Sequence, residues 1–566
     1  MSRSTRHRLV RCAATLLLAG SAQGQEPPKP DRLFIHGNVL TPHGTAQAVA
    51  VQGRSIVAVG SDTEVLALRH EGAEIVDLAG RTLMPGLYDM HVHVFAAGQD
   101  KLACKLPQGA GAARIAAAVR ACAQHAAPGA WITGGSWVGA AFRTGEQTRA
   151  VLDAAAPNNP VLLNDEALHS VWVNSRALAL AGVNRQTPDP QGGRIERDAR
   201  GEPTGVLREL ATRLVEDRVP PPSLAAQIAA VKAASDEMLS YGIVGFTDAA
   251  VRQANVMGLS QYAKSGQLKQ HARGCIVWGP TSDGGEALLA QRQALSGGTF
   301  RLDCVKLFLD GVPTESRTGA MLAPYAALPG REVHGDERGM LLIPQTDLNA
   351  LVTRFDQQGL EVKFHAAGDA ATRAAVDAIA SARTANGFSG PRHEIAHNTF
   401  IAEADLPRAA TLGFAWEFSP YIWWPTPITA VDIARAVGAE RMKRLWPIRE
   451  GLDSRALVVA GSDWPVVPSV NPWLAIETMV TRQAPGGEGA VQGEAERITR
   501  REALTIFTRN AAALLGRLDR GGTIEVGKEA DLIVLDRDPL TVPVGRIHDS
   551  QVLETYIGGE RVYRRE

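Results

Sequence analysis

Apolar, strand-like runs recur through the middle of the chain, and most are followed by alanine-rich stretches with a helical pattern. Strands that alternate with helices are typical of parallel β/α units. Eight such units in a row predict a closed barrel, so the expected fold class is α/β, a (β/α)8 TIM barrel. The eight runs are 83–94, 243–250, 271–279, 300–311, 361–366, 392–398, 414–420 and 457–465.

The two ends of the chain follow another pattern, in which short alternating strands are separated by Gly and Asp. Neither end has enough strands for a stable sandwich of its own. We therefore predict one small composite β-sandwich, built from 25–82 and 516–566, beside a barrel that spans 83–515. An insertion at about 95–240 is expected within the barrel, because structureless loops of that length are uncommon in compact domains.

Residues 1–24 have the order of a secretory signal peptide. Four arginines precede the apolar run 12–20, and small residues that suit cleavage follow at 22–24. No Arg-Arg pair is present, so we expect a Sec-type route and an exported, periplasmic protein. The apolar run is too short to span a membrane, and no later stretch is long and apolar enough. A disordered basic N-terminus is the alternative interpretation.

The chain has 566 residues, a formal net charge of −1 and 45% hydrophobic residues. That balance lacks the basic footprint of nucleic-acid-binding proteins and is ordinary for a globular protein. We therefore expect a small-molecule substrate, no nucleic-acid partner, and no membrane association once the signal is removed. A homo-oligomer is compatible with this composition.

Removal of the signal would leave four cysteines, an even number that permits disulfides in an exported protein. Cys104 and Cys122 flank a loop and a helical stretch, and we predict that they pair. Cys275 and Cys304 lie in apolar strand-like runs, so we expect them to behave as small buried hydrophobic residues.

Six polar side chains fall on the predicted barrel strands, mostly near their carboxyl ends, where the active sites of such barrels lie. His91 and His93 alternate along one strand, so they point the same way. Lys306 lies inside an apolar strand, where a lysine is costly unless it is paired or neutralised. Each residue alone has a structural explanation, but together they predict a metal site, since imidazole and carboxylate are normal zinc ligands. The six are His91, His93, Lys306, His365, His397 and Asp463.

Polar neighbours of these six have other expected roles. Lys363, beside His365, is expected to point away from the site. Asp89 is expected to orient the histidines from behind. Asp463 itself has an alternative role, which is to cap the helix that follows it.

Several motifs resemble one family of enzymes. They are Asp89-Met-His91-Val-His93, Lys306-Leu-Phe-Leu-Asp-Gly311, His365-Ala-Ala-Gly-Asp369 and Gly461-Ser-Asp-Trp-Pro465. As an ordered set they are similar to the metal-dependent amidohydrolase superfamily. The similarity is closest to its amidohydrolase-3 branch, the YtcJ-like proteins related to N-substituted formamide deformylase. It covers nearly all of the chain after the signal peptide.

The resemblance implies a barrel with a composite β-sandwich and a centre of two divalent metal ions, commonly Zn2+. The implied ligands are His91, His93 and Asp463 for one ion, His365 and His397 for the other, and a carboxylated Lys306 that bridges both.

The resemblance also implies an amidohydrolase, an enzyme that cleaves an amide-type, non-peptide C–N bond of a small molecule. A metal-activated hydroxide would attack, and Asp463 would be the catalytic residue that takes and returns the proton. One alternative is a mononuclear deaminase or cyclic-amide hydrolase on the same scaffold, which needs no bridge from Lys306. The other is a non-catalytic binding or regulatory protein, since fold does not imply function.

Four residues are candidate substrate contacts. His169 and Arg317 match family motifs in loops, and for His169 a structural hydrogen bond is the alternative. Trp424 and Trp464 follow the last two predicted strands, in an aromatic cluster that suits an apolar or aromatic group, with loop packing as the alternative. Glu417 lies in a segment where many relatives have a Gln-Pro-containing strand end, so substrate contacts from that strand are not carried over.

Overall fold

A computed structural model of the protein describes residues 28–566 apart from short gaps, so the predicted signal peptide lies outside the described residues. The gaps are 108, 138–140, 144, 166–169, 191–192, 280–283, 315–316, 328–336 and 424–426. Within the described residues, no helix is both long and apolar enough to cross a membrane.

Eight strands form the central sheet, and each is parallel to the next barrel strand along the chain. They are β8 (Leu87–Val92), β15 (Ile243–Val251), β16 (His271–Trp278), β17 (Phe300–Phe308), β18 (Glu361–Ala366), β19 (Glu394–His397), β20 (Ala415–Phe418) and β21 (Leu457–Ala460). The first and last strands meet at their carboxyl ends. There the amide of Asp463 donates to the carbonyl of His91 at 2.7 Å, and the amide of His93 donates to that of Trp464 at 2.9 Å. The predicted barrel is confirmed.

A glycine allows the first and last strands to approach. A Cβ atom at Gly461 would lie 2.3 Å from the Cβ of His91 and 2.4 Å from its amide nitrogen. Any other residue would force β8 and β21 apart, because interiors are close-packed and leave no room for such an overlap. Gly461 therefore brings Asp463 next to the histidines that end β8.

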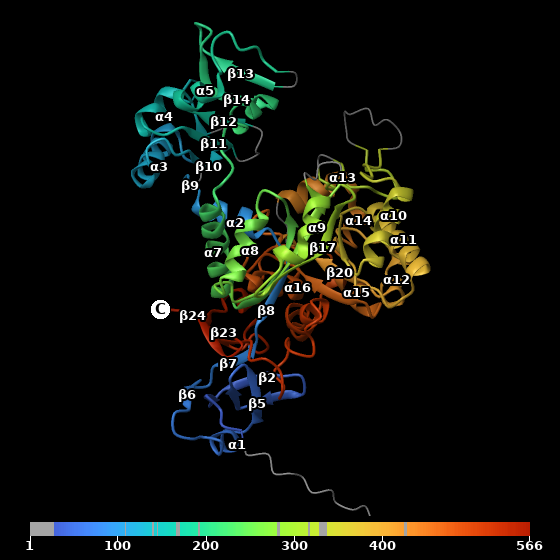
Figure 1. Cartoon of the computed structure of the whole chain (residues 1–566). Coiled ribbons are helices and arrows are strands. Elements are labelled where there is room, and N and C mark those ends of the chain that lie inside the picture. Colours follow the sequence, from blue (N-terminus) through green and yellow to red (C-terminus); the bar gives the residue numbers. More distant parts are fainter. Residues whose placement is uncertain are drawn as a thin grey trace, which may run out of the picture.

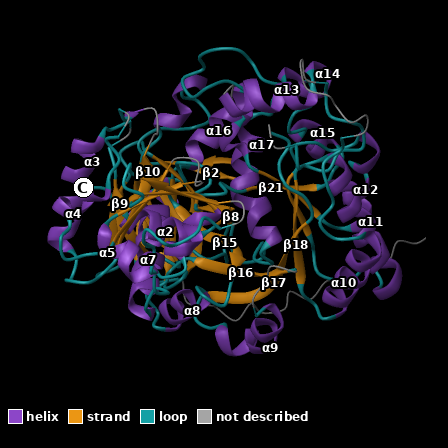
Figure 2. Ribbon diagram, turned by 90° about the horizontal axis from the view of Figure 1, so that it is seen from above, coloured by secondary structure: helices purple, strands orange, loops and turns teal. Residues whose placement is uncertain are grey.

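Helices cover the outside of the barrel and bury their apolar faces against it, as β/α units require. The view along the barrel in Figure 2 shows them around the strands. A clear case is α11 (Asp369–Asn386), which buries an alanine-rich face and packs beside α10 (Gln345–Gln357). These helices hold the strands in place, so the strand ends can carry polar side chains.

The two ends of the chain meet in one sandwich on the amino side of the barrel (Figure 1). Strand β7 (Thr82–Pro85) pairs antiparallel with β22 (Leu532–Leu535), so one sheet contains strands from both ends. The other sheet contains β1 (Arg32–Ile35), whose Phe34 packs edge-on against Tyr556 of the first sheet with 5.1 Å between ring centroids. The predicted composite β-domain is confirmed.

The apolar run 83–94 holds two strands, and the prediction of a single barrel strand is wrong. β7 ends at Pro85 in the sandwich, and β8 begins at Leu87 in the barrel. Gly86 separates them, and a Cβ there would lie 2.3 Å from Val244. Hydrophobicity could not show this break, because both strands are largely buried.

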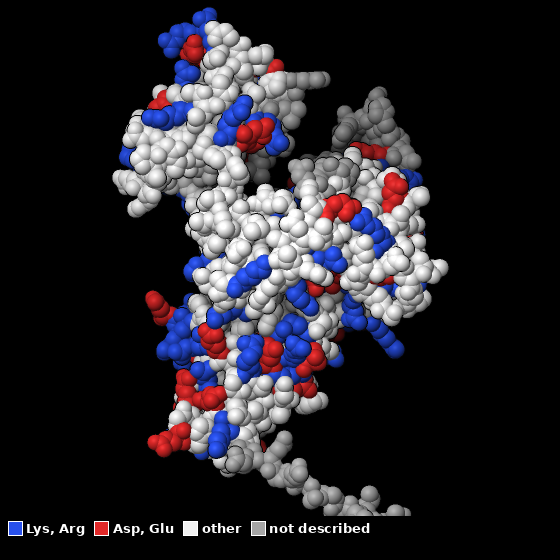
Figure 3. All heavy atoms as spheres, in the orientation of Figure 1, with Lys and Arg blue, Asp and Glu red and all other residues white. Residues whose placement is uncertain are grey.

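A further sheet lies between β8 and β15 in the sequence, on the side toward which the barrel strands run (Figure 1). Its strands are β9 (Cys104–Lys105), β10 (Ile132–Trp137), β11 (Val161–Asp165), β12 (Ser170–Val173), β13 (Gly193–Arg197) and β14 (Pro203–Glu209). Two packed helices, α2 (Val94–Leu102) and α7 (Leu224–Ser240), join it to the barrel. Acidic and basic side chains are interspersed over the face in view in Figure 3.

Two disulfides are present. Cys104 and Cys122 are bonded, as predicted. Cys275 and Cys304 are bonded as well, so the expectation that they are unpaired hydrophobic residues is wrong. They lie opposite each other on the adjacent strands β16 and β17, with 4.2 Å between their Cα atoms. Burial and disulfide pairing go together here, because the parallel register brings two separate apolar runs into contact.

Candidate metal centre

The six predicted ligands come from five strands and meet at the carboxyl end of the barrel. His93 Nε2 lies 3.1 Å from Asp463 Oδ1, and His91 Nε2 lies 3.5 Å from the same oxygen. One nitrogen from each histidine and one carboxylate oxygen of Asp463 all lie within 4.8 Å of one another. That spacing suits three ligands of a single ion.

The other three predicted residues surround this group. The ring of His397 lies 4.7 Å from that of His91 and 4.7 Å from that of His365, measured between centroids. The amine of Lys306 is 3.4 Å from His91 Nε2, and His397 Nδ1 is 4.0 Å from Asp463 Oδ2. The lysine therefore lies against His91, and His397 connects the first group of ligands to His365.

The electrostatics of the site favour metal-binding forms of these groups. Burial lowers the pKa of His91 and of His397 well below the usual value, so both imidazoles are neutral and can donate a lone pair. Burial alone would raise the pKa of Asp463, but His397 and His93 hold it below its usual range, so Asp463 is a carboxylate. Burial, with the nearby charge of Lys363, lowers the pKa of Lys306 to about 7.

Three side chains missed as site residues contact the Nδ1 atoms of histidine rings. Glu417 Oε1 lies 2.6 Å from Nδ1 of His91, and Asp310 Oδ1 lies 3.1 Å from Nδ1 of His365. Ser419 Oγ is 3.1 Å from Nδ1 of His397. Metal-binding histidines usually have such a partner on their second nitrogen. The sequence contains a signal for Asp310 and Glu417, because each is a carboxylate in or just after an apolar strand. It contains no signal for which histidine each one contacts.

Asp89 was expected to contact the histidine rings, but its carboxylate accepts hydrogen bonds from backbone amides. The side chain that contacts the ring of His91 is Glu417. One oxygen of Asp89 accepts from the amides of His91 at 3.0 Å and Ser462 at 2.9 Å, which ties β8 to the residues after β21. The other oxygen has no hydrogen-bond partner among the described residues. Burial raises the pKa of Asp89 to about 6.

One more carboxyl group is buried at this end of the barrel. Asp248 lies near the end of β15 and is 4% exposed. Burial raises its pKa to about 6, although His93 acts in the opposite direction. In the sequence, the signal for this residue is the Thr247-Asp248 pair near the end of an apolar run.

The described candidate substrate residues are packed into loops. Arg317 is 3% exposed; its guanidinium donates to Glu337 at 2.8 Å and to the carbonyl of Ala326 at 2.7 Å. Trp464 is also 3% exposed, directly after Asp463. Both positions are thus occupied by internal packing. His169 and Trp424 lie outside the described residues.

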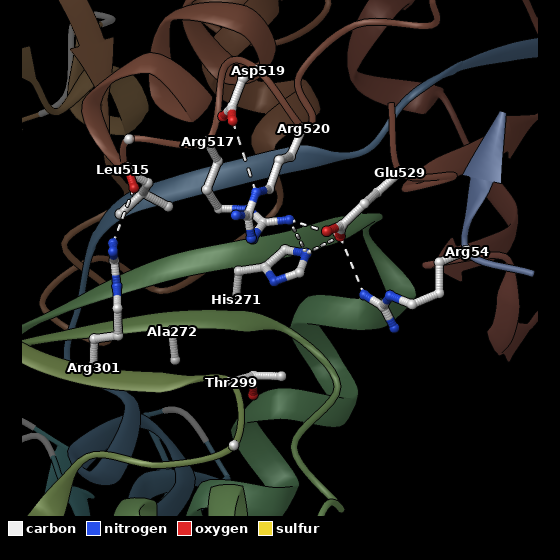
Figure 4. Close-up of a pocket in the computed structure, with 12 residues that line it drawn as sticks. Arg54, His271, Ala272, Thr299, Arg301, Leu515, Arg517, Asp519, Arg520 and Glu529 are labelled. Carbon is white, nitrogen blue, oxygen red and sulfur yellow. Dashed lines mark hydrogen bonds and ion pairs between the residues drawn. The ribbon is translucent and has the colours of Figure 1, made fainter. Parts of the chain in front are cut away.

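A second group of possible ligands lies at the opposite end of the barrel. His271, Glu529 and Asp531 also have ligand atoms within 4.8 Å of one another. Figure 4 shows the guanidinium of Arg517 next to His271 and Glu529 of this group. Its Nη2 lies 2.9 Å from Glu529 Oε2, 2.9 Å from His271 Nε2 and 3.6 Å from Asp531 Oδ2. The nearby hollow of about 410 Å³ is also lined by Arg54, Arg301 and Arg520, whose positive charges oppose the binding of a metal cation next to this group.

Comparison with known proteins identifies the family of this chain. The family model described as "Amidohydrolase family" matches residues 74–563. The chain belongs to the amidohydrolase family. N-substituted formamide deformylase of Arthrobacter pascens is 30% identical, over 94% of this chain and 98% of the relative. YtcJ of Bacillus subtilis is 29% identical over the same shares of the two chains.

A solved structure supports the fold of this amidohydrolase. An uncharacterized metal-dependent hydrolase from Pyrococcus furiosus superimposes with a TM-score of 0.72 and 24% sequence identity, over 90% of this chain and all of that one. The family match and the deformylase relative make the chain a hydrolase that acts on carbon–nitrogen bonds.

Proposed function

We propose that this amidohydrolase cleaves an amide-type, non-peptide C–N bond of a small molecule, and that its centre binds two Zn2+ ions. The observation that carries the proposal is the position of Lys306. Its amine lies 3.4 Å from Nε2 of His91, and the ring of His91 lies 4.7 Å from that of His397. The relative named as a deformylase of N-substituted formamides makes a formamide one candidate substrate.

Lys306 fits this role because its charge can change. With a pKa of about 7, about half of the amine is free base at neutral pH. A free amine adds CO2 to form a carbamate and releases one proton. The carbamate carries one negative charge and two oxygens. Lys306 would then hold both ions, with His91, His93 and Asp463 on one and His365 and His397 on the other.

Different side chains have different roles in the proposed reaction. Ions held at such a site acidify water and polarise a carbonyl group. Asp463 is a carboxylate that keeps 17% of its side-chain surface exposed, so it can meet both substrate and water. It accepts a proton from the attacking water and passes it to the leaving nitrogen. Glu417, Asp310 and Ser419 keep the histidine rings oriented during this exchange.

The test is turnover of a panel of amides, N-acyl amines and N-formyl amines by purified, Zn2+-loaded protein, with a chelated sample as control. We expect activity on at least one class, loss of that activity on chelation, and recovery when Zn2+ is restored. Activity that is unchanged after complete metal removal would contradict the proposal.

The runner-up is a mononuclear deaminase or cyclic-amide hydrolase on the same scaffold, and metal content separates the two. Near two ions per chain supports the proposal, while near one ion per chain, with ammonia as product, supports a deaminase. A protein that binds metal but turns over no member of either panel would support a non-catalytic binding role.

We also propose that the protein is exported to the periplasm after cleavage of residues 1–24. The support is the basic, apolar and small-residue order of that segment. N-terminal sequencing of the mature protein should begin near residue 25. A mature protein that begins at Met1 would contradict export by this route.

A further inference from the structure

A row of buried charged side chains crosses the inside of the barrel just below the metal centre. Its members, here called the charge ladder, are Arg273, Glu394, Lys363 and Glu417, and each is at most 1% exposed. They come from the four strands β16, β19, β18 and β20. The interior of such a barrel is normally filled with branched aliphatic side chains.

The members of the charge ladder are joined by direct contacts. Arg273 Nη2 lies 2.6 Å from Glu394 Oε1, and Lys363 Nζ lies 3.1 Å from the same oxygen. Lys363 also contacts the Oε2 oxygen of Glu417. The expectation that Lys363 points away is wrong, because residues two apart on a strand share a face, and His365 faces the inside.

A contribution to the stability of the folded state does not explain the charge ladder. Moving ionised groups out of water is costly, and buried ion pairs can often be replaced by apolar side chains without loss of stability. A buried row of this kind therefore calls for another reason. The upper end of the charge ladder offers one, because the second oxygen of Glu417 lies 2.6 Å from His91 Nδ1.

That contact determines which ring nitrogen of His91 faces the centre. A neutral imidazole has one N–H and one lone pair. With its Nδ1–H donated to Glu417, His91 presents the lone pair of Nε2, which faces Lys306 at 3.4 Å and Asp463 at 3.5 Å. Without an acceptor at Nδ1, the proton could lie on Nε2 instead, and that nitrogen could not bind a cation.

We propose that Glu417 is a positioning residue for His91, and that Lys363, Glu394 and Arg273 hold its carboxylate in place. This inference rests on the proposed metal centre. Glu417 keeps the ring in the metal-binding tautomer, and Lys363 provides the opposite charge that a carboxylate needs at this depth. The charge ladder thus contributes to metal affinity rather than to folding.

The first test replaces Glu417 and Lys363 together, so that no unpaired charge is left in the barrel. Glu417→Leu with Lys363→Met removes the acceptor, and we expect Zn2+ to bind about 10–100-fold more weakly. Glu417→Gln with Lys363→Met keeps an acceptor oxygen and should restore most of that loss. The readouts are the dissociation constant, from competition with a chelator, and the visible absorption spectrum of the Co2+-loaded protein.

A matched control replaces another buried ion pair that is far from the metal centre. Arg383 and Asp356, on α11 and α10, are 1% exposed and in direct contact. Arg383→Met with Asp356→Asn should alter thermal stability but leave Zn2+ affinity and the Co2+ spectrum unchanged. A general effect of losing a buried ion pair would appear in this control as well.

A second variant covers the case in which the Leu and Met pair does not fold. Glu417→Asp keeps both charges but shortens the side chain by one methylene and withdraws its oxygen from His91. We expect roughly tenfold weaker Zn2+ binding. Wild-type affinity and spectrum in Glu417→Asp would overturn the inference. Wild-type protein that binds no Zn2+ would instead overturn the proposed metal centre, so the two failures are distinct.

Discussion

Both ends of the barrel place histidine next to carboxylate, but only the carboxyl end offers those atoms to a metal. His91, His93 and Asp463 form one group and His271, Glu529 and Asp531 the other, and in each the ligand atoms lie within 4.8 Å. By residue type and spacing the two are nearly equivalent. Ligand chemistry alone therefore does not distinguish a metal centre from a structural cluster.

The two groups differ in the basic side chain that lies next to them. At the amino end this is Arg517, whose guanidinium is not deprotonated in proteins and so permanently occupies the position of a metal. At the carboxyl end it is Lys306, whose buried amine has a pKa of about 7. A lysine can lose its proton and gain a carboxylate, which turns a competitor of the metal into a ligand.

The largest effect is expected when the carboxylate of Asp463, the proposed proton acceptor, is neutralised. Asp463→Asn should lower turnover by roughly 10²–10⁴-fold, because the proton acceptor is lost. Asp531→Asn makes the same change at the other end and should leave turnover near wild type. Both are measured on the same substrate, with the metal content of each protein determined. Similar losses in the two variants would mean that the amino-end cluster also takes part in catalysis.

Lys306→Arg should make the carboxyl end resemble the amino end. A guanidinium cannot form the carbamate and would remain charged against His91, so we expect less than one Zn2+ per chain and a loss of turnover in proportion to the missing metal. Metal analysis after dialysis checks this, with circular dichroism as the folding control. Two ions per chain in Lys306→Arg would disprove a bridging role for this side chain.

The pH dependence of reactivation tests the free amine of Lys306. The folded pKa is lowered to about 7, so below pH 7 the amine is increasingly protonated and cannot add CO2. After removal of metal and bicarbonate, the rate of recovery on adding metal at a fixed concentration of dissolved CO2 should fall about tenfold per pH unit below 7 and level off above it. A recovery rate that does not vary between about pH 5.5 and 8 would contradict this.

The smallest effect on turnover is expected at the amino end. Arg517→Met removes the guanidinium that Glu529 and Asp531 share and should cost about 2–3 kcal/mol of stability. This is less than for a fully buried pair, because Arg517 and Glu529 are 16% and 18% exposed. Turnover should stay near wild type. Added Zn2+ should raise the thermal midpoint of the variant more than that of wild type, since the vacated group can then take an ion.

Much of the fold could be predicted because its signals are local. Apolar strands followed by helical stretches indicated the barrel, and strands at both ends indicated the shared sandwich. The break at Gly86 was missed because it separates two buried strands of the same character. The Cys275–Cys304 bond was missed because it depends on the register of β16 and β17.

The sequence by itself determined the barrel, the composite sandwich and the identity of six candidate ligands, since these follow from periodicity and from residue types at strand ends. Only the tertiary structure decided which cation lies beside each histidine cluster, and that Lys363 and Glu417 meet below His91. Glu417 and His91 are 326 residues apart. Contacts over such distances exist only once the barrel closes, and the same closure buries Lys306 and lowers the pKa of its amine.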